Sequence, residues 1–132
     1  MAEKGKIIFE KSFGIQDFQT QKKNTNQSRY RIYSTTKTFT ATIILLLNEE
    51  GKLSLNDKLS KYYPDFPKGD SITIENLLTH TSGIPEGTNP EETKSEALLL
   101  KSLYGKPFAF SPGTSWGYSN PNYYLLGILS QR

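Results

Sequence analysis

The chain has 132 residues, with no cysteine, one histidine and a formal net charge of +3 at pH 7. The absence of cysteine excludes a disulfide framework and a thiolate metal site, and a single histidine argues against a histidine-rich metal site. Lysine and arginine residues are scattered among acidic residues instead of forming a basic stripe, so nucleic acid is not an expected partner. We expect no metal and no cofactor.

The length fits one ordinary domain over residues 1–132. Residues 1–10 contain no continuous apolar segment of signal-peptide length, and the longest apolar run, residues 43–47, is too short to cross a bilayer. We therefore expect neither a signal peptide nor an integral membrane segment in this chain. The composition leaves the compartment open.

The first predicted elements are two antiparallel strands. Short apolar and aromatic runs occur within residues 4–20 and are separated by Gly14, a pattern typical of a hairpin. Residues 21–29 are polar and rich in turn-forming side chains, so they predict a loop.

A central helix is predicted from Ser34 to about Glu50. Ser34 or Thr35 can serve as its N-cap, and Gly51 is expected as its C-cap. Residues 42–50 are apolar on nearly every face of this helix, so we expect other elements to pack around it on several sides.

Three further helices are predicted after the central one. The first covers residues 72–80 and is capped by Thr73, and each of the other two begins at an Asn-Pro pair that supplies an N-cap and a first helical residue. These pairs are Asn89 and Pro90, before a helix over about residues 91–103, and Asn120 and Pro121, before the last helix. Strands precede helices, which predicts an α+β fold with an amino-terminal antiparallel hairpin packed on a mainly helical region.

The start of the central helix carries a possible nucleophile. Ser34 and Lys37 are three residues apart, so on a helix they share one face and the amine can approach the hydroxyl. An amine that is held away from water can take the proton of a hydroxyl, and the helix N-terminus favours the negative charge that develops in acyl transfer. Taken alone, the S-x-x-K pattern arises by chance in many chains, where it is a capping serine followed by a solvent-facing lysine.

A second pattern lies near the carboxyl end, where Tyr118, Ser119 and Asn120 form a Y-S-N triplet. A phenol can act as a general acid or base when nearby cations lower its pKa, and an asparagine amide can both donate and accept hydrogen bonds. The alternatives are a packing role for Tyr118 and simple helix capping for Asn120.

Taken together, three blocks resemble one superfamily. They are "YSTTKTFTATIILLLNEEGKLSLNDKLSKYYPDF", "ITIENLLTHTSGIP" and "PGTSWGYSNPNYYLLG", and they occur in this order over most of residues 5–130. The resemblance is to serine beta-lactamases and penicillin-binding proteins, in particular the class C beta-lactamase, D-alanyl-D-alanine carboxypeptidase and esterase branch.

The resemblance implies a serine hydrolase with a beta-lactamase/transpeptidase-like fold that acts on a beta-lactam, a D-amino-acid peptide or a small ester. It implies that Ser34 is the acylated nucleophile, Lys37 its proton partner and Tyr118 the catalytic tyrosine, with Asn120 orienting Lys37 and the substrate amide. His80 is expected to be a hydrogen-bonded structural residue. Most such proteins work outside the cytoplasm, which is the location that the resemblance implies.

One motif of the superfamily has no match in this sequence. A triplet of Lys or His, then Ser or Thr, then Gly lies on a strand that lines the cleft in such proteins, and no such triplet follows Asn120. The resemblance therefore covers about the amino-terminal half. We expect residues 1–132 to be an incomplete domain, weak or inactive alone, and able to pair with a complementary carboxyl-terminal segment or to form a swapped oligomer.

Two other functions remain open at this point. The first is a non-catalytic ligand-recognition or interaction module built on the same fold. The second is a different serine hydrolase that uses Ser82 or Ser119 with His80. The segment "GYSNP" around Ser119 lacks the final glycine of the G-x-S-x-G nucleophile elbow, which argues against the second function.

Overall fold

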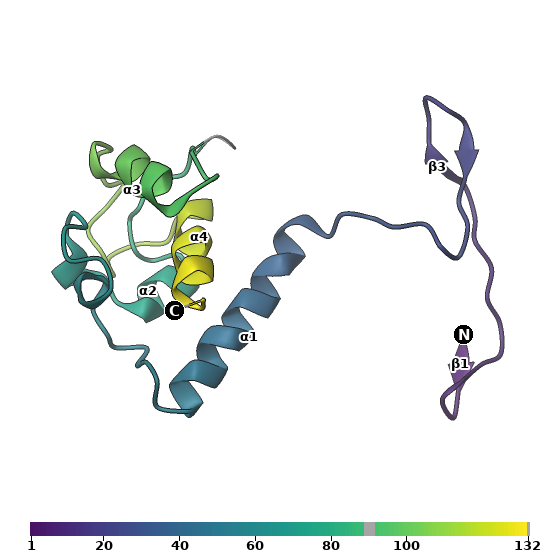
Figure 1. The fold of residues 1–132 in the computed structure, drawn as a ribbon, viewed down its shortest axis with the longest axis horizontal. Helices are drawn as coiled ribbons and strands as arrows, with labels where there is room; N and C mark the ends of the chain where they lie inside the picture. Colours follow the sequence, from purple (N-terminus) through teal and green to yellow (C-terminus); the bar gives the residue numbers. More distant parts are fainter. Residues whose placement is uncertain (89–91, 132) are drawn as a thin grey trace. The chain divides into compact units, whose positions relative to one another are not determined.

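The computed structural model describes residues 1–88 and 92–131. The chain divides into two compact units, an amino-terminal unit, Met1–Tyr33, and a helical unit, Ser34–Arg132 (Figure 1). Within the described residues there are four α-helices, three short 3₁₀ helices and two small antiparallel sheets, so the predicted α+β class is confirmed. Also within these residues, no helix combines the length and the apolar composition needed to cross a membrane.

The amino-terminal unit contains two hairpins where the sequence predicted one. β1 (Ala2–Glu3) pairs with β2 (Lys6–Ile7), and β3 (Ile15–Asp17) pairs with β4 (Lys22–Lys23), both antiparallel. β4 therefore lies in the stretch that was predicted to be a loop. The single-hairpin prediction was wrong because it took apolar runs as the sign of a strand. The observed strands are only two or three residues long, and each contains at least one polar residue.

Turn chemistry explains where the two hairpins reverse. Lys4 and Gly5 both have positive φ, 47° and 77°, as the tight two-residue turns between paired strands require. In the second hairpin, Asp17 Oδ1 accepts hydrogen bonds from the backbone N–H groups of Gln19 and Thr20 and so stabilises the turn. Gly14, which was expected to separate the strands, instead lies just before β3.

The central helix, α1 (Thr36–Glu49), follows a 3₁₀ turn over Tyr33–Thr35. Thr35 occupies the N-cap position, but its side chain makes no capping hydrogen bond. At the other end, Glu50 is the C-cap and Gly51 follows with φ +70°, the conformation that glycine adopts most readily. The predicted helix is confirmed to within about two residues, with Gly51 one position beyond the C-cap.

The remaining helices are α2 (Ile74–Leu78), α3 (Glu96–Tyr104) and α4 (Asn120–Leu129). Thr73 caps α2 through a capping box with Asn76, as expected. The N-cap of α3 is Ser95, so this helix begins about five residues later than predicted. The Asn89 and Pro90 pair lies outside the described residues. Asn120 is the first residue of α4 and Ser119 is its N-cap, one position earlier than predicted.

The core of the helical unit is built from side chains of α2, α3 and α4, of the segment between α1 and α2, and from Ile44 of α1. Its fully buried apolar side chains include Ile44, Leu59, Ile72, Ile74, Leu77, Leu99, Leu125 and Leu126. Two 3₁₀ turns, Leu59–Lys61 and Gly69–Ser71, place residues 59 and 72 in this core.

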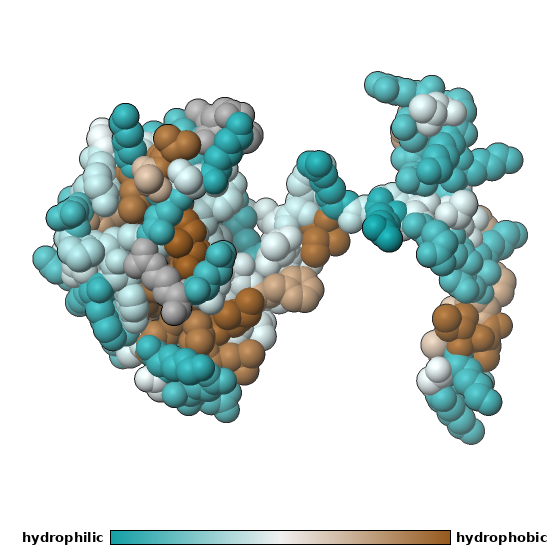
Figure 2. All heavy atoms as spheres, viewed as in Figure 1, coloured by the Kyte–Doolittle hydropathy of each residue, from teal (hydrophilic) through white to brown (hydrophobic). Residues whose placement is uncertain are grey.

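The helix α1 is covered on one side only. Among its residues Ile44 alone is buried, although α1 packs against α4. Several large apolar side chains of α1 are exposed instead: Phe39 (62%), Ile43 (43%), Leu45 (50%) and Leu46 (50%). Apolar surface also shows on the helical unit in Figure 2. The expectation that α1 is packed on several sides is therefore not met by the residues that the structure describes.

Candidate active site

The four residues singled out in the sequence meet at one end of α1. Ser34 Oγ lies 2.8 Å from the hydroxyl of Tyr118 and 3.2 Å from Lys37 Nζ. Lys37 Nζ donates to Asn120 Oδ1 at 2.6 Å, and the Tyr118 hydroxyl lies 3.3 Å from the same oxygen. Side chains more than 80 residues apart in sequence thus form one hydrogen-bonded network.

Local backbone geometry explains how the network assembles. Ser34 lies in the 3₁₀ turn before α1 and Lys37 in the first turn of α1, so both project from the same end of the helix. On the other side, Ser119 has extended backbone angles, φ −146° and ψ 114°. Because alternate side chains of an extended segment share a face, Tyr118 and Asn120 point together while Ser119 is buried behind them.

The neighbours of Tyr118 lower the pKa of its phenol. The hydrogen bonds with Lys37 and then with Ser34 hold the pKa of Tyr118 below its ordinary value of 10.0, while partial burial opposes this effect. Lys37 Nζ also lies over the Tyr118 ring, 4.9 Å from its centroid, and 5.6 Å from that of Tyr123. Ser34 and Tyr118 are both exposed, so a substrate can reach them.

His80 supports the segment that carries Tyr118. Its Nδ1 accepts a hydrogen bond from the backbone N–H of Ser119 at 3.1 Å, and its backbone oxygen accepts one from Gly117 at 3.0 Å. Its ring stacks on that of Tyr118 with centroids 4.7 Å apart. Burial, and then the nearby ammonium of Lys37, lower the pKa of His80, which favours the neutral ring whose Nδ1 accepts the N–H of Ser119. The predicted hydrogen bonding of His80 is confirmed, and its purely structural role stays a prediction.

The alternative nucleophiles Ser82 and Ser119 are both fully buried. Ser82 Oγ donates to Asn122 Oδ1 at 2.8 Å and accepts the backbone N–H of Ile84 at 3.1 Å. Ser119 Oγ has no hydrogen-bond partner among the described residues. Since a substrate cannot reach either hydroxyl in this fold, the alternative hydrolase that pairs one of them with His80 is inconsistent with the structure.

Sequence reasoning missed Glu86, which lies beside the network. Its carboxylate accepts hydrogen bonds from both the backbone and the side chain of Asn120. Glu86 is part of the segment "SGIPEG", which has the composition of a structural turn. A single acidic residue in a glycine- and proline-rich loop has no periodicity, so only its position after the histidine block could have drawn attention to it.

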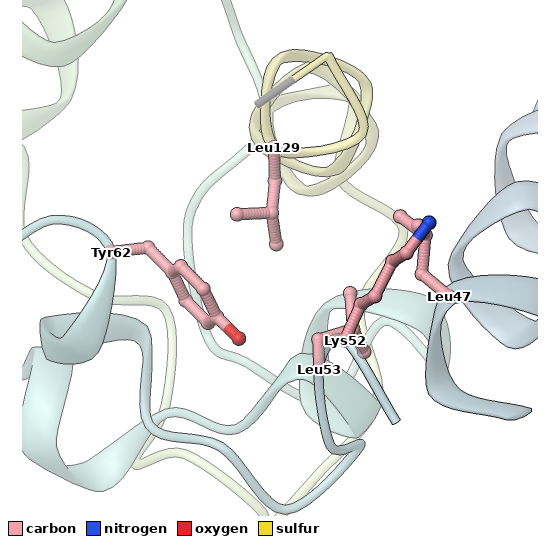
Figure 3. A pocket seen from close by; sticks show the side chains of 5 residues that line it. All are labelled: Leu47, Lys52, Leu53, Tyr62 and Leu129. Carbon is pink, nitrogen blue, oxygen red and sulfur yellow. The ribbon is translucent and has the colours of Figure 1, made fainter. Parts of the chain in front are cut away.

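A separate pocket lies near the other end of α1. It has a volume of about 360 Å³ and is lined by Leu47, Lys52, Leu53, Tyr62 and Leu129, whose side chains surround it in Figure 3. The lining is largely apolar, with three leucines beside Lys52 and Tyr62. The pocket shares no residue with the network around Ser34.

Among the described residues, no three His, Cys, Asp or Glu side chains cluster in a way that could hold a metal ion.

Comparison with known proteins shows which family the chain resembles. The beta-lactamase family model matches residues 1–132. Protein flp of Staphylococcus aureus (strain COL) is 37% identical over 141 residues, covering 99% of this chain and 28% of that protein.

Two solved structures show the same fold. FmtA from Staphylococcus aureus matches with a TM-score of 0.81 and 28% identity, covering 96% of this chain and 36% of that one. A class C beta-lactamase in complex with cefoxitin matches with a TM-score of 0.76 and 32% identity, covering 89% of this chain and 34% of that one. The chain spans about a third of the length of these proteins, less than the half that the sequence suggested. The chain belongs to the beta-lactamase family.

Proposed function

We propose that this chain carries the nucleophile and the proton-transfer groups of a serine hydrolase that works through an acyl-enzyme. One observation carries the proposal: Ser34 Oγ is within hydrogen-bonding distance of both Tyr118 and Lys37, and Asn120 holds Lys37 in place. A nucleophile, a proton acceptor and a positive charge that stabilises the deprotonated acceptor, here Ser34, Tyr118 and Lys37, are parts that nucleophilic catalysis can use.

The contacts support a definite order of proton transfers. Ser34 Oγ attacks the carbonyl carbon of the substrate while its proton passes to Tyr118, whose oxygen is the nearer acceptor at 2.8 Å. The ammonium of Lys37 stabilises the negative charge that the Tyr118 oxygen carries before it takes up this proton. When the bond to the leaving group breaks, the same proton passes to that group and an ester of Ser34 remains. Water then hydrolyses the ester by the reverse proton path.

The acyl donor is a carbonyl compound with an amide, lactam or ester bond. The matched class C beta-lactamase was solved in complex with cefoxitin, which makes beta-lactams the first donors to test. D-amino-acid peptides and small esters undergo the same chemistry at Ser34, because in each of them a hydroxyl attacks a carbonyl and displaces a protonated leaving group.

Full activity requires more polypeptide than the two described units provide. The tetrahedral intermediate needs two donors for its oxyanion, and the backbone N–H of Ser34 supplies one. Loss of one such donor typically costs about 10² to 10³ in rate. The exposed apolar side of α1 also needs a cover, and this chain spans only about a third of its relatives. We propose that a complementary segment supplies both the cover and the second donor.

Covalent labelling tests the proposal. A fluorophosphonate should add to the full chain, and mass mapping should place the adduct on Ser34. The adduct should be absent in Ser34→Ala, and its formation should slow by about 10² to 10⁴ in Lys37→Ala. Lys101→Ala, which removes an exposed lysine from α3, serves as the matched control and should label at the original rate. Labelling that persists in Ser34→Ala would remove the proposal.

A further inference from the structure

The loop that follows α2 brings a carboxylate to the candidate active site. Glu86 Oε2 accepts a hydrogen bond from the backbone N–H of Asn120 at 2.5 Å, and Glu86 Oε1 accepts one from Asn120 Nδ2 at 2.7 Å. The two oxygens of one carboxylate therefore hold both the main chain and the side chain of one residue. Hydrogen bonds to an ionised acceptor are stronger than those between neutral groups.

The amide of Asn120 has two chemically different ends, and its surroundings distinguish them. Oδ1 accepts from Lys37 Nζ at 2.6 Å, while Nδ2 donates to Glu86. A half-turn of the amide would set Nδ2 against the ammonium and Oδ1 against the carboxylate, which pairs donor with donor and acceptor with acceptor. The ammonium and the carboxylate thus favour the same orientation.

The backbone contact fixes the position of the residue as well as its orientation. Asn120 is the first residue of α4, where a backbone N–H has no acceptor within the helix. The preceding N-cap, Ser119, forms no side-chain capping bond, so Glu86 supplies the acceptor from another segment. Negative charge at a helix N-terminus is also stabilised by the helix dipole.

We propose that Glu86 is a positioning residue of the candidate active site: it holds Asn120 so that Oδ1 faces Lys37. The effect on acylation rests on the proposed function, whereas the orientation of Asn120 can be measured without it.

Glu86 also acts on the network through its charge. Among the described residues, the titratable groups near it include Tyr118 from the segment before α4, His80 from the segment after α2 and Lys37 from α1, which shares the Asn120 amide with it. Lys106, from the segment after α3, donates to the backbone oxygen of the adjacent Gly87 at 2.9 Å. The carboxylate of Glu86 raises the pKa of Tyr118 and of His80, against the larger effects that lower them. Neutralising Glu86 should therefore lower the pKa of Tyr118 further and move the rise of acylation with pH to lower pH.

The kinetic test compares Glu86→Ala, Glu86→Gln and a matched control, Glu49→Ala, which removes a glutamate from the far end of α1. In the full chain, Glu86→Ala should slow fluorophosphonate labelling of Ser34 by about 10- to 100-fold, since small misplacements of catalytic groups have costs of this size. Glu86→Gln keeps one acceptor and should recover part of the rate, with its pH profile moved to lower pH. Glu49→Ala should label at the original rate.

A double-mutant cycle separates a specific effect of Glu86 on Asn120 from a general disturbance of the fold. If Glu86 acts through Asn120, then Glu86→Ala should slow labelling little when Asn120 is already Ala. The proposal would be overturned if Glu86→Ala slowed labelling equally with Asn120 present and with Asn120 replaced by Ala. It would also be overturned if the Glu86→Ala single variant were labelled at the original rate.

The orientation is tested by NMR of the Asn120 amides. The backbone N–H and the side-chain NH₂ of Asn120 should exchange at least about 10-fold faster with solvent in Glu86→Ala than in the original chain and in Glu49→Ala, because a charge-assisted bond is lost. Unchanged exchange would overturn the proposal whether or not Ser34 is labelled. An original chain that is not labelled at all would remove the proposed function, and the exchange data would then decide the orientation alone.

Discussion

At the scale of single residues, Tyr118 contacts both Ser34, the proposed nucleophile, and two other residues of the site. Its hydroxyl contacts Ser34, its ring stacks on His80, and Lys37 lies over the same ring. The phenol is thus oriented by an imidazole and influenced electrostatically by an ammonium. The hydrogen bonds with Lys37 and Ser34, together with the charge of Lys37, lower the pKa of Tyr118 although the residue is exposed.

We predict that Tyr118→Phe slows acylation of Ser34 by about 10² to 10⁴, the usual cost of losing a general base, without unfolding the chain. Stopped-flow labelling measures the rate and circular dichroism checks the fold. Tyr124→Phe is the matched control, because Tyr124 has the same exposure of 41% and lies on α4. An equal effect of the two substitutions would show that Tyr118 has no particular role.

For the two buried serines beside the site, we predict different effects of substitution by alanine on the free energy of unfolding. Ser82→Ala breaks two buried hydrogen bonds and should lower the free energy of unfolding by about 1 to 3 kcal/mol. Ser119→Ala removes a buried hydroxyl that has no partner among the described residues, so it should leave stability unchanged or raise it slightly. Urea unfolding of both variants measures the difference. A larger loss for Ser119→Ala than for Ser82→Ala would contradict this account.

At the scale of elements, the turn between α1 and α2 is stabilised by one carboxylate. Asp57 Oδ2 accepts from Lys61 Nζ at 2.8 Å, from the Tyr62 hydroxyl at 2.6 Å and from the backbone N–H of Ser54 at 2.9 Å. These bonds lower the pKa of Asp57 from its ordinary value of 3.8 to about 2. The ionised form is therefore stabilised in the folded chain.

The sign of the resulting pH dependence follows from this lowered pKa. The contribution of Asp57 is fully present above pH 3.8 and is lost as the pH falls to about 2. Because solvent screens this carboxylate, we predict that Asp57→Asn lowers the free energy of unfolding by only about 1 kcal/mol at pH 7 and has little effect near pH 2. Asp65→Asn, at an exposed position in the same region, is the control. Denaturant unfolding at the two pH values measures the free energy of unfolding of each variant. An equal decrease for Asp57→Asn at both pH values would contradict the prediction.

Elements with strong local signals could be predicted from the sequence. Gly51 marked the end of α1 and Thr73 the start of α2, because a positive φ and a capping hydrogen bond each demand particular residue types. Ser34 and Lys37 were singled out by their spacing of one helical turn, and the resemblance of three blocks to the superfamily joined Tyr118 and Asn120 to them. The short polar strands and Glu86 could not be found, because strand pairing and long-range hydrogen bonds depend on tertiary contacts that have no periodic pattern.

At the scale of the whole molecule, the exposed apolar side of α1 predicts association. Residues 1–132 alone should form oligomers in sedimentation velocity, or bind a complementary segment when one is added. Leu46→Glu, which places a charge on this side of α1, should shift the distribution towards monomer. Lys101→Glu on α3 is the control and should not. A monodisperse monomer with full hydrolytic activity and no added segment would contradict the proposed incompleteness.

The central claim is that Ser34 becomes acylated and is then released by water. The most direct measurement is an intact-mass time course of the full chain with cefoxitin or a small ester, with and without a complementary segment, followed by peptide mapping. We predict an adduct on Ser34 that forms faster and decays with release of product when the segment is present. An adduct that forms on Ser34 but never decays would show the non-catalytic recognition module instead. No adduct on Ser34 under any of these conditions would contradict the account.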